Sequence, residues 1–105
     1  MTVPAPDPFA ALGDPHRRAI LETLGRSESS VQELADELPI SRPAVSRHLR
    51  LLKGAGLVSD RAEGVKRIYR LDDQGVEEVR RYMEHIWGEA ESRFRMVADN
   101  TTDAV

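Results

Sequence analysis

The sequence has no cysteine, so it offers no disulfide, no thiolate metal ligand and no thiol for redox switching. It also has no apolar run near the ~20 residues that a helix needs to cross a bilayer. Its first residues, MTVPAPDPFAALG, lack a basic region followed by an apolar core, so we expect no export signal. These absences favour a cytoplasmic protein with no membrane partner.

Enzyme signatures are missing as well. The sequence has no Gly-x-Ser-x-Gly elbow and no phosphate-binding loop, and its C-terminal acids are scattered as on a solvated helix face. We therefore expect no catalytic activity and no cofactor.

The length of 105 residues predicts one domain over 1–105, with a core at about 7–97 and a flexible tail after about 98. The composition, 40% hydrophobic and 31% charged, is typical of a folded globular chain. A domain this small often gains stability by pairing with a second copy of itself.

Positive charge is concentrated in the middle of the chain. Residues 1–40 carry a formal charge of −4, residues 41–70 carry +6 and residues 71–105 carry −5, within a net charge of −3. Such polarity directs a polyanion onto one surface and away from the others.

The first half of the chain contains a helix-turn-helix pattern. After a proline-containing arm, Asp14-Pro15 is typical of a helix start, and the apolar stripe that follows is expected to end at Gly25. Ser30 and Glu33 have the spacing of a capping box, and Pro39 ends that second helix. Only two residues then precede Ser41, which begins the next helix, so the two helices are joined by a tight turn.

The third helix, expected over 42–55, is amphipathic. At 100° per residue, Val45, Leu49 and Leu52 fall on one face and predict its contact with the core. The opposite face is small and basic, with Pro43, Ser46, Arg47, Arg50 and Gly54. Small residues let a helix enter a groove about 12 Å wide, where arginine binds guanine edges or phosphates. A plain solvated basic face is the alternative.

After this helix, the spacing of the apolar residues changes from the helical period to that of extended chain. LVSDRAEGVKRIYRL predicts two strands around a turn at Glu63-Gly64, with Val65, Ile68, Tyr69 and Leu71 in the second strand. The cations that flank the turn are Arg61, Lys66, Arg67 and Arg70. They suit contact with a nucleic-acid backbone, and an ordinary solvated hairpin is the alternative. The fold class predicted so far is mainly α with a small β-hairpin.

Three stretches resemble the winged helix-turn-helix repressors of the arsenical-resistance (ArsR) family: ALGDPHRRAILETL, SVQELADELPISRPAVSRHLRLLKGAGLV and GVKRIYRL. The resemblance covers about residues 9–97, and its most specific motif is Ser-x-Pro-Ala-Val-Ser-x-His-Leu, residues 41–49. It implies a homodimeric transcriptional regulator, usually a repressor of its own operon. The helix over 42–55 would read the major groove of double-stranded DNA, and the hairpin over 61–70 would be the wing.

Together, the pattern and the resemblance predict the DNA contacts, which are Ser41, Arg42, Pro43, Ser46, Arg47, His48, Arg50, Arg61, Lys66 and Arg67. For His48 we expect packing beside the core, with a phosphate contact as the alternative. A winged helix that binds a protein instead of DNA is the rival function. Exposed arginines at 42, 47 and 50 argue against that rival, because a protein interface sheds charge at its centre.

The metal ligands of the family are not matched. Where metal-sensing members carry a Cys-x-Cys-type motif, this sequence has Gln32, Glu33 and Asp36. His85 and Glu89 lie one helical turn apart, but no Asp-x-His precedes them. We predict no metal site, with a repressor that uses His and acid ligands on the last helix as the alternative. The effector, if the protein has one, is unknown.

The last helix, capped by Asp72 or Asp73, is expected over 76–97, about 33 Å at 1.5 Å per residue. Its apolar stripe exceeds what a small core covers, so we expect part of it to pair with a second copy beside an N-terminal helix at 7–12. The expected dimer residues are Phe9, Leu12, Val79, Met83, Ile86, Trp87, Ala90 and Phe94. Packing on its own domain alone is the other interpretation.

Overall fold

The computed structural model describes residues 7–103, with side chains as far as Ala98; the expected proline-containing arm at 1–6 lies outside this range. The fold is mainly α-helical with a small antiparallel sheet, which confirms the predicted class. The elements, in chain order, are α1 (Pro8–Ala11), α2 (Pro15–Arg26), β1 (Ser29–Ser30), α3 (Val31–Glu37), α4 (Arg42–Gly54), β2 (Val58–Glu63), β3 (Lys66–Leu71) and α5 (Asp73–Asp103).

The helices begin at the capping residues that the sequence predicts. The Asp14 carboxylate accepts hydrogen bonds from the backbone N–H of His16 at 2.8 Å and of Arg17 at 3.1 Å. Ser30 and Glu33 form the capping box that starts α3. The predicted end of α2 was wrong by one residue: Gly25 lies within the helix, which continues to Arg26.

A single apolar core joins α2, α3 and α4 to the base of the sheet. The largest fully buried side chains are Ile20, Leu34, Leu49, Leu52, Val45 and Val58. Three of these are the predicted inner face of α4, so the core fixes which face of that helix is turned outward.

The sheet has three strands where the sequence predicted two, in the order β1–β3–β2. β2 and β3 form the predicted hairpin, paired from Val58↔Leu71 to Glu63↔Lys66. Gly64 adopts a φ of +61° in the turn, a conformation that glycine takes without steric cost. Val65 was expected in the second strand but lies in this turn, fully exposed.

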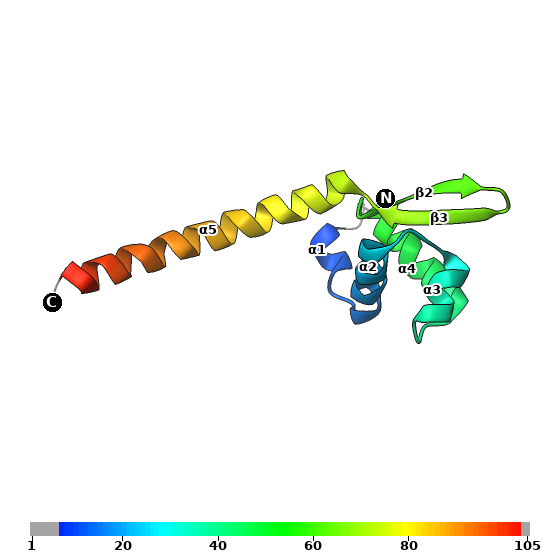
Figure 1. Cartoon of the computed structure of the whole chain (residues 1–105), viewed down its shortest axis with the longest axis horizontal. Helices are drawn as coiled ribbons and strands as arrows, with labels where there is room; N and C mark the ends of the chain where they lie inside the picture. Colours follow the sequence, from blue (N-terminus) through cyan, green and yellow to red (C-terminus); the bar gives the residue numbers. More distant parts are fainter. Residues whose placement is uncertain (1–6, 104–105) are drawn as a thin grey trace, which may run out of the picture.

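Helix α5 extends far beyond the rest of the molecule (Figure 1). With α5 included, the molecule measures 68 × 38 × 22 Å along its principal axes. Asp72 accepts hydrogen bonds from the N–H groups of Gln74 and Gly75, and so caps the helix as predicted. A Cβ at Gly75 would lie 1.8 Å from the carbonyl oxygen of Gly56, so only glycine allows this close approach of α5 to the turn after α4. We expected the helix to end near Val97 with a frayed tail, but it continues to Asp103.

Among the residues described, none of the helices combines the length and the apolar character that crossing a membrane requires.

Candidate nucleic-acid interface

The outward face of α4 presents two exposed arginines. Arg47 and Arg50 point away from the buried face formed by Val45, Leu49 and Leu52. Neither guanidinium group makes a hydrogen bond or an ion pair within the part of the chain that the structure describes. Their guanidinium groups therefore keep all of their donors available to a ligand.

The start of α4 is tied to α3. The Ser41 hydroxyl accepts a hydrogen bond from the Ala44 N–H at 3.3 Å, so it acts first as the helix cap. Arg42 donates to the side-chain oxygen of Gln32 at 3.0 Å. Pro43 is exposed and Ser46 is half-buried. Because both side chains are small, no bulky group beside the arginines would keep the helix out of a DNA groove.

A hollow lies between this helix start and the hairpin. It is lined by Ser30, Val31, Gln32, Arg42, Val65, Lys66, Arg67 and Tyr69. Three of these side chains are cationic and none is acidic. The structure thus brings together Arg42, Lys66 and Arg67, which the sequence placed in two separate elements.

The hairpin cations differ in how far they are engaged within the chain. Arg61 pairs with Glu28 at 2.7 Å and more distantly with Glu63 at 3.8 Å. Lys66 has no carboxylate within 4 Å among the described residues, although its charge acts on Glu33, and Arg67 lies 3.3 Å from the carboxylate of Asp60. Lys66 is therefore the predicted wing residue most available to a phosphate.

Asp60 connects α4 to the hairpin, a contact that the sequence analysis missed. Its carboxylate is only 6% exposed and contacts Lys53 of α4 at 2.7 Å as well as Arg67 of β3. The hydrogen bond from Lys53, with the charges of Lys53 and Arg67, lowers the pKa of Asp60 despite its burial. The pairing of β2 with β3, which brings Asp60 near Arg67, is not a local signal in the sequence.

His48 is half-buried on α4, as expected of a packed residue, and its ring meets that of His16 edge-on with centroids 5.8 Å apart. Burial lowers the pKa of His48, so the imidazole is predominantly neutral at pH 7. A neutral ring contributes no charge to a phosphate contact.

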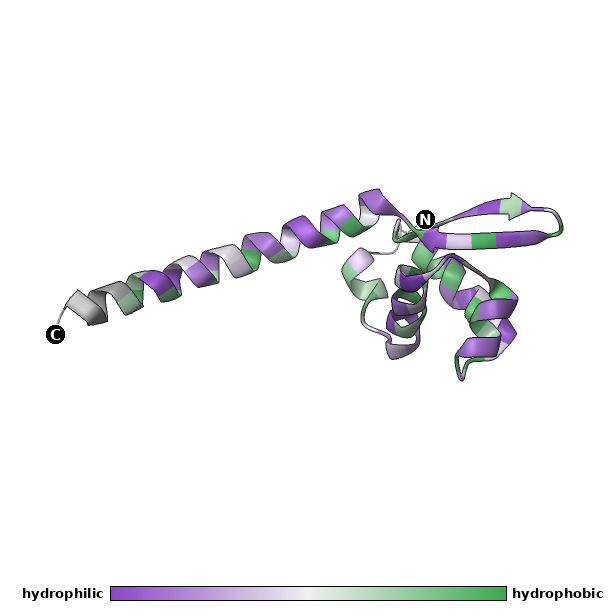
Figure 2. Cartoon of the chain, in the orientation of Figure 1, coloured by the Kyte–Doolittle hydropathy of each residue, from purple (hydrophilic) through white to green (hydrophobic). Residues whose placement is uncertain are grey.

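The residues predicted for pairing fall into two groups. Leu12 and Val79 are partly buried against the core of their own domain, and Phe9 packs on Tyr82 with ring centroids 4.7 Å apart. The others project from α5 into solvent, namely Met83, Ile86, Trp87, Ala90 and Phe94. Figure 2 shows hydrophobic segments recurring along α5 at a distance from the rest of the molecule.

His85 and Glu89 lie on one face of α5, as their spacing predicts, with 3.7 Å between the imidazole and the carboxylate. Both side chains are mostly exposed, and this pair has no third ligand among the described residues.

Comparison with known proteins matches this geometry. A family model described as a helix-turn-helix domain matches residues 12–61, which run from just before α2 to the middle of β2. The chain is 43% identical over 95 residues to the HTH-type transcriptional regulator Rv2034 of Mycobacterium tuberculosis, covering 90% of this chain and 89% of that protein. It is 40% identical over 82 residues to the HTH-type transcriptional repressor SmtB of the same species, covering 69% of this chain and 61% of that one.

A solved structure, the ArsR-like transcriptional regulator from Rhodococcus sp. RHA1, superposes with a TM-score of 0.73 at 35% identity. The match covers 90% of this chain and 87% of that one. The chain belongs to the ArsR family of winged helix-turn-helix regulators. It is a DNA-binding transcriptional repressor.

Proposed function

We propose that the protein represses transcription as a homodimer on an inverted-repeat operator, with α4 in the major groove and the wing on the backbone. The observation that carries this proposal is the pair of exposed arginines, Arg47 and Arg50, on the outward face of a helix whose other face is fixed by the core. On this account they read base edges, since arginine pairs bidentately with guanine.

The second contact is to the phosphate backbone. The hollow between α4 and the wing is lined by Arg42, Lys66 and Arg67 without an acid, which suits a phosphate path. Such contacts fix register and supply affinity that depends on salt, but they carry little sequence information.

The proposed dimer forms through α5. Met83 is 43% exposed, Trp87 66% and Phe94 77%, and these side chains recur at helical spacing along one stripe. The radius of gyration is 18.8 Å, where a compact chain of this length has about 13 Å, because α5 has no neighbour over most of its length. Pairing with a second copy about a two-fold axis is the commonest way to cover such a stripe. The resulting interface would be continuous with Phe9 of α1.

Pairing also determines what the operator looks like. Two recognition helices related by a two-fold axis reach successive major grooves when they lie about 34 Å apart. The half-sites would then be inverted copies whose centres lie about one helical turn from each other.

The dimer is tested by Phe94→Asp, with Ser92→Asp as the matched control. Ser92 is also exposed on α5, but two residues correspond to about 200° around a helix, so it faces away from the stripe. Sedimentation should show monomers for Phe94→Asp and dimers for Ser92→Asp, with unchanged helix content by circular dichroism. A folded Phe94→Asp dimer would remove α5 from the interface.

A further inference from the structure

Two helices bring a carboxylate and two imidazoles together, and of these three residues only His48 is among the predicted DNA contacts. Asp14 and His16 come from the start of α2, and His48 comes from the middle of α4. One ligand-type atom of each residue lies within 4.8 Å of those of the other two. His48 is more than 30 residues from the other two in sequence, so only the packing of α2 on α4 completes the cluster.

The geometry is close to that of a bound transition metal. Ligand atoms about 2.0–2.1 Å from a tetrahedral zinc ion lie roughly 3.4 Å from each other. The cluster must therefore contract by about 1.4 Å at most. His16 is exposed, and the ring nitrogens of both histidines have no hydrogen-bond partner among the described residues.

The chemistry of the donors selects the class of ion. Two imidazoles with one carboxylate suit borderline ions such as Zn²⁺, Co²⁺ and Ni²⁺, whereas Mg²⁺ and Ca²⁺ prefer sets of oxygen ligands. The backbone hydrogen bond from Arg17 lowers the pKa of Asp14, which is ionised at pH 7, and His48 is predominantly neutral. Asp14 and His48 are thus in their ligating forms.

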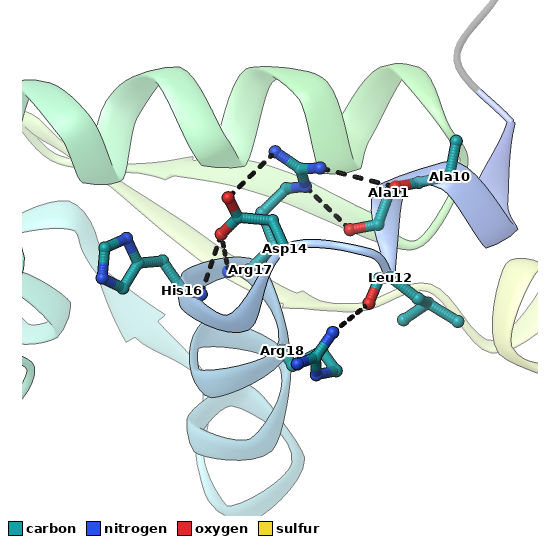
Figure 3. A network of polar contacts seen from close by, with 7 residues as sticks. All are labelled: Ala10, Ala11, Leu12, Asp14, His16, Arg17 and Arg18. Atoms are coloured by element: carbon teal, nitrogen blue, oxygen red, sulfur yellow. Dashed lines mark hydrogen bonds and ion pairs between the residues drawn. The ribbon is translucent and has the colours of Figure 1, made fainter.

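Two features oppose a cation here, and both are partly offset. The positive end of the α2 dipole lies at Asp14, but the Asp14 carboxylate itself caps that end. The Arg17 guanidinium lies 4.0 Å from Asp14, but it is held toward α1, where its Nε donates to the Ala11 carbonyl at 2.7 Å. In Figure 3 the His16 ring and the Arg17 guanidinium lie on opposite sides of the Asp14 carboxylate.

We propose that Asp14, His16 and His48 bind one divalent transition-metal ion per chain, with water completing the coordination. The ion links the start of α2 to the recognition helix beside Arg47, and it adds positive charge next to the DNA-reading face. This site is separate from the His85–Glu89 pair on α5.

The test is calorimetric titration of the full chain with Zn²⁺, supported by Co²⁺ absorption spectra. Asp14→Asn removes the charged ligand but keeps a good helix cap, and His16→Ala removes an exposed ligand that supports no core contact. His85→Ala is the matched control, since the chain contains only three histidines. The wild type and His85→Ala should bind one ion with the same affinity, and the other two variants should lose at least tenfold.

Three results would overturn the proposal. They are the absence of stoichiometric binding to the wild type, unchanged affinity in His16→Ala, and loss of binding in His85→Ala alone. The last would place the metal on α5. Because the readout needs no DNA, its failure would not affect the proposed operator binding.

Discussion

Substitution of Asp60 by asparagine tests the connection between the recognition helix and the wing. The Asp60 carboxylate is 6% exposed and accepts from Lys53 at 2.7 Å, while Arg67 lies at 3.3 Å. Hydrogen bonds to charged groups contribute about 1.5–3 kcal/mol when protected, and exposed ion pairs about 0.2–1 kcal/mol. Both cations are more than half exposed, so we expect Asp60→Asn to lower the free energy of unfolding by about 1–2 kcal/mol.

Urea denaturation at fixed protein concentration measures the effect, which corresponds to a midpoint about 1 M lower for an m-value near 1.5 kcal/mol/M. The pKa of Asp60 is lowered in the folded state, so its stabilisation is complete above the unfolded pKa of about 3.9. It is lost as pH falls through the lower folded value, so the difference between wild type and variant should narrow below about pH 4.

Glu63→Gln is the matched control on the same hairpin. Glu63 is 66% exposed and lies 3.8 Å from Arg61, so its loss should change the free energy of unfolding by less than about 0.5 kcal/mol. Equal midpoint shifts in the two variants, or a difference for Asp60→Asn that does not change with pH, would refute this reasoning.

Two further predictions concern DNA contact and helix capping. Arg47→Ala should weaken operator binding by on the order of 1–3 kcal/mol and relax the base preference at one position. Lys66→Ala should weaken binding to all DNA sequences alike and reduce the slope of log K against log salt concentration by about one. Competition binding at several salt concentrations separates the two, and identical profiles would contradict the assigned roles. Ser30→Ala removes the hydroxyl that accepts from the Glu33 N–H at 3.2 Å, and should cost about 0.5–2 kcal/mol by thermal denaturation. No loss of stability would show that the capping box contributes nothing to the fold.

The helix-turn-helix was predictable because its signals are local. Caps at Asp14, Ser30 and Ser41 are set by residues within one turn of the helix that they start. The inner face of α4 follows from its period alone, so the outward position of Arg47 and Arg50 was predictable as well.

Features that depend on distant partners could not be predicted. β1 consists of two serines without β-propensity, and it is a strand only because it pairs with Tyr69 and Ile68 of β3. The ion pairs of Asp60, and the approach of His48 to His16, likewise follow from tertiary packing. The end of α5 was misplaced because the apolar stripe marks the surface that needs covering, whereas the helix itself continues past that stripe.

The central claim is that a two-fold pair of α4 helices reads an inverted repeat. The most direct test is selection of fragments from sheared source-genome DNA by the purified protein, followed by sequencing of the bound pool. The account predicts one inverted-repeat motif upstream of a few genes, with half-site centres about 10–10.5 base pairs apart or a multiple of that. A pool without any motif, bound only through salt-sensitive contacts, would contradict it.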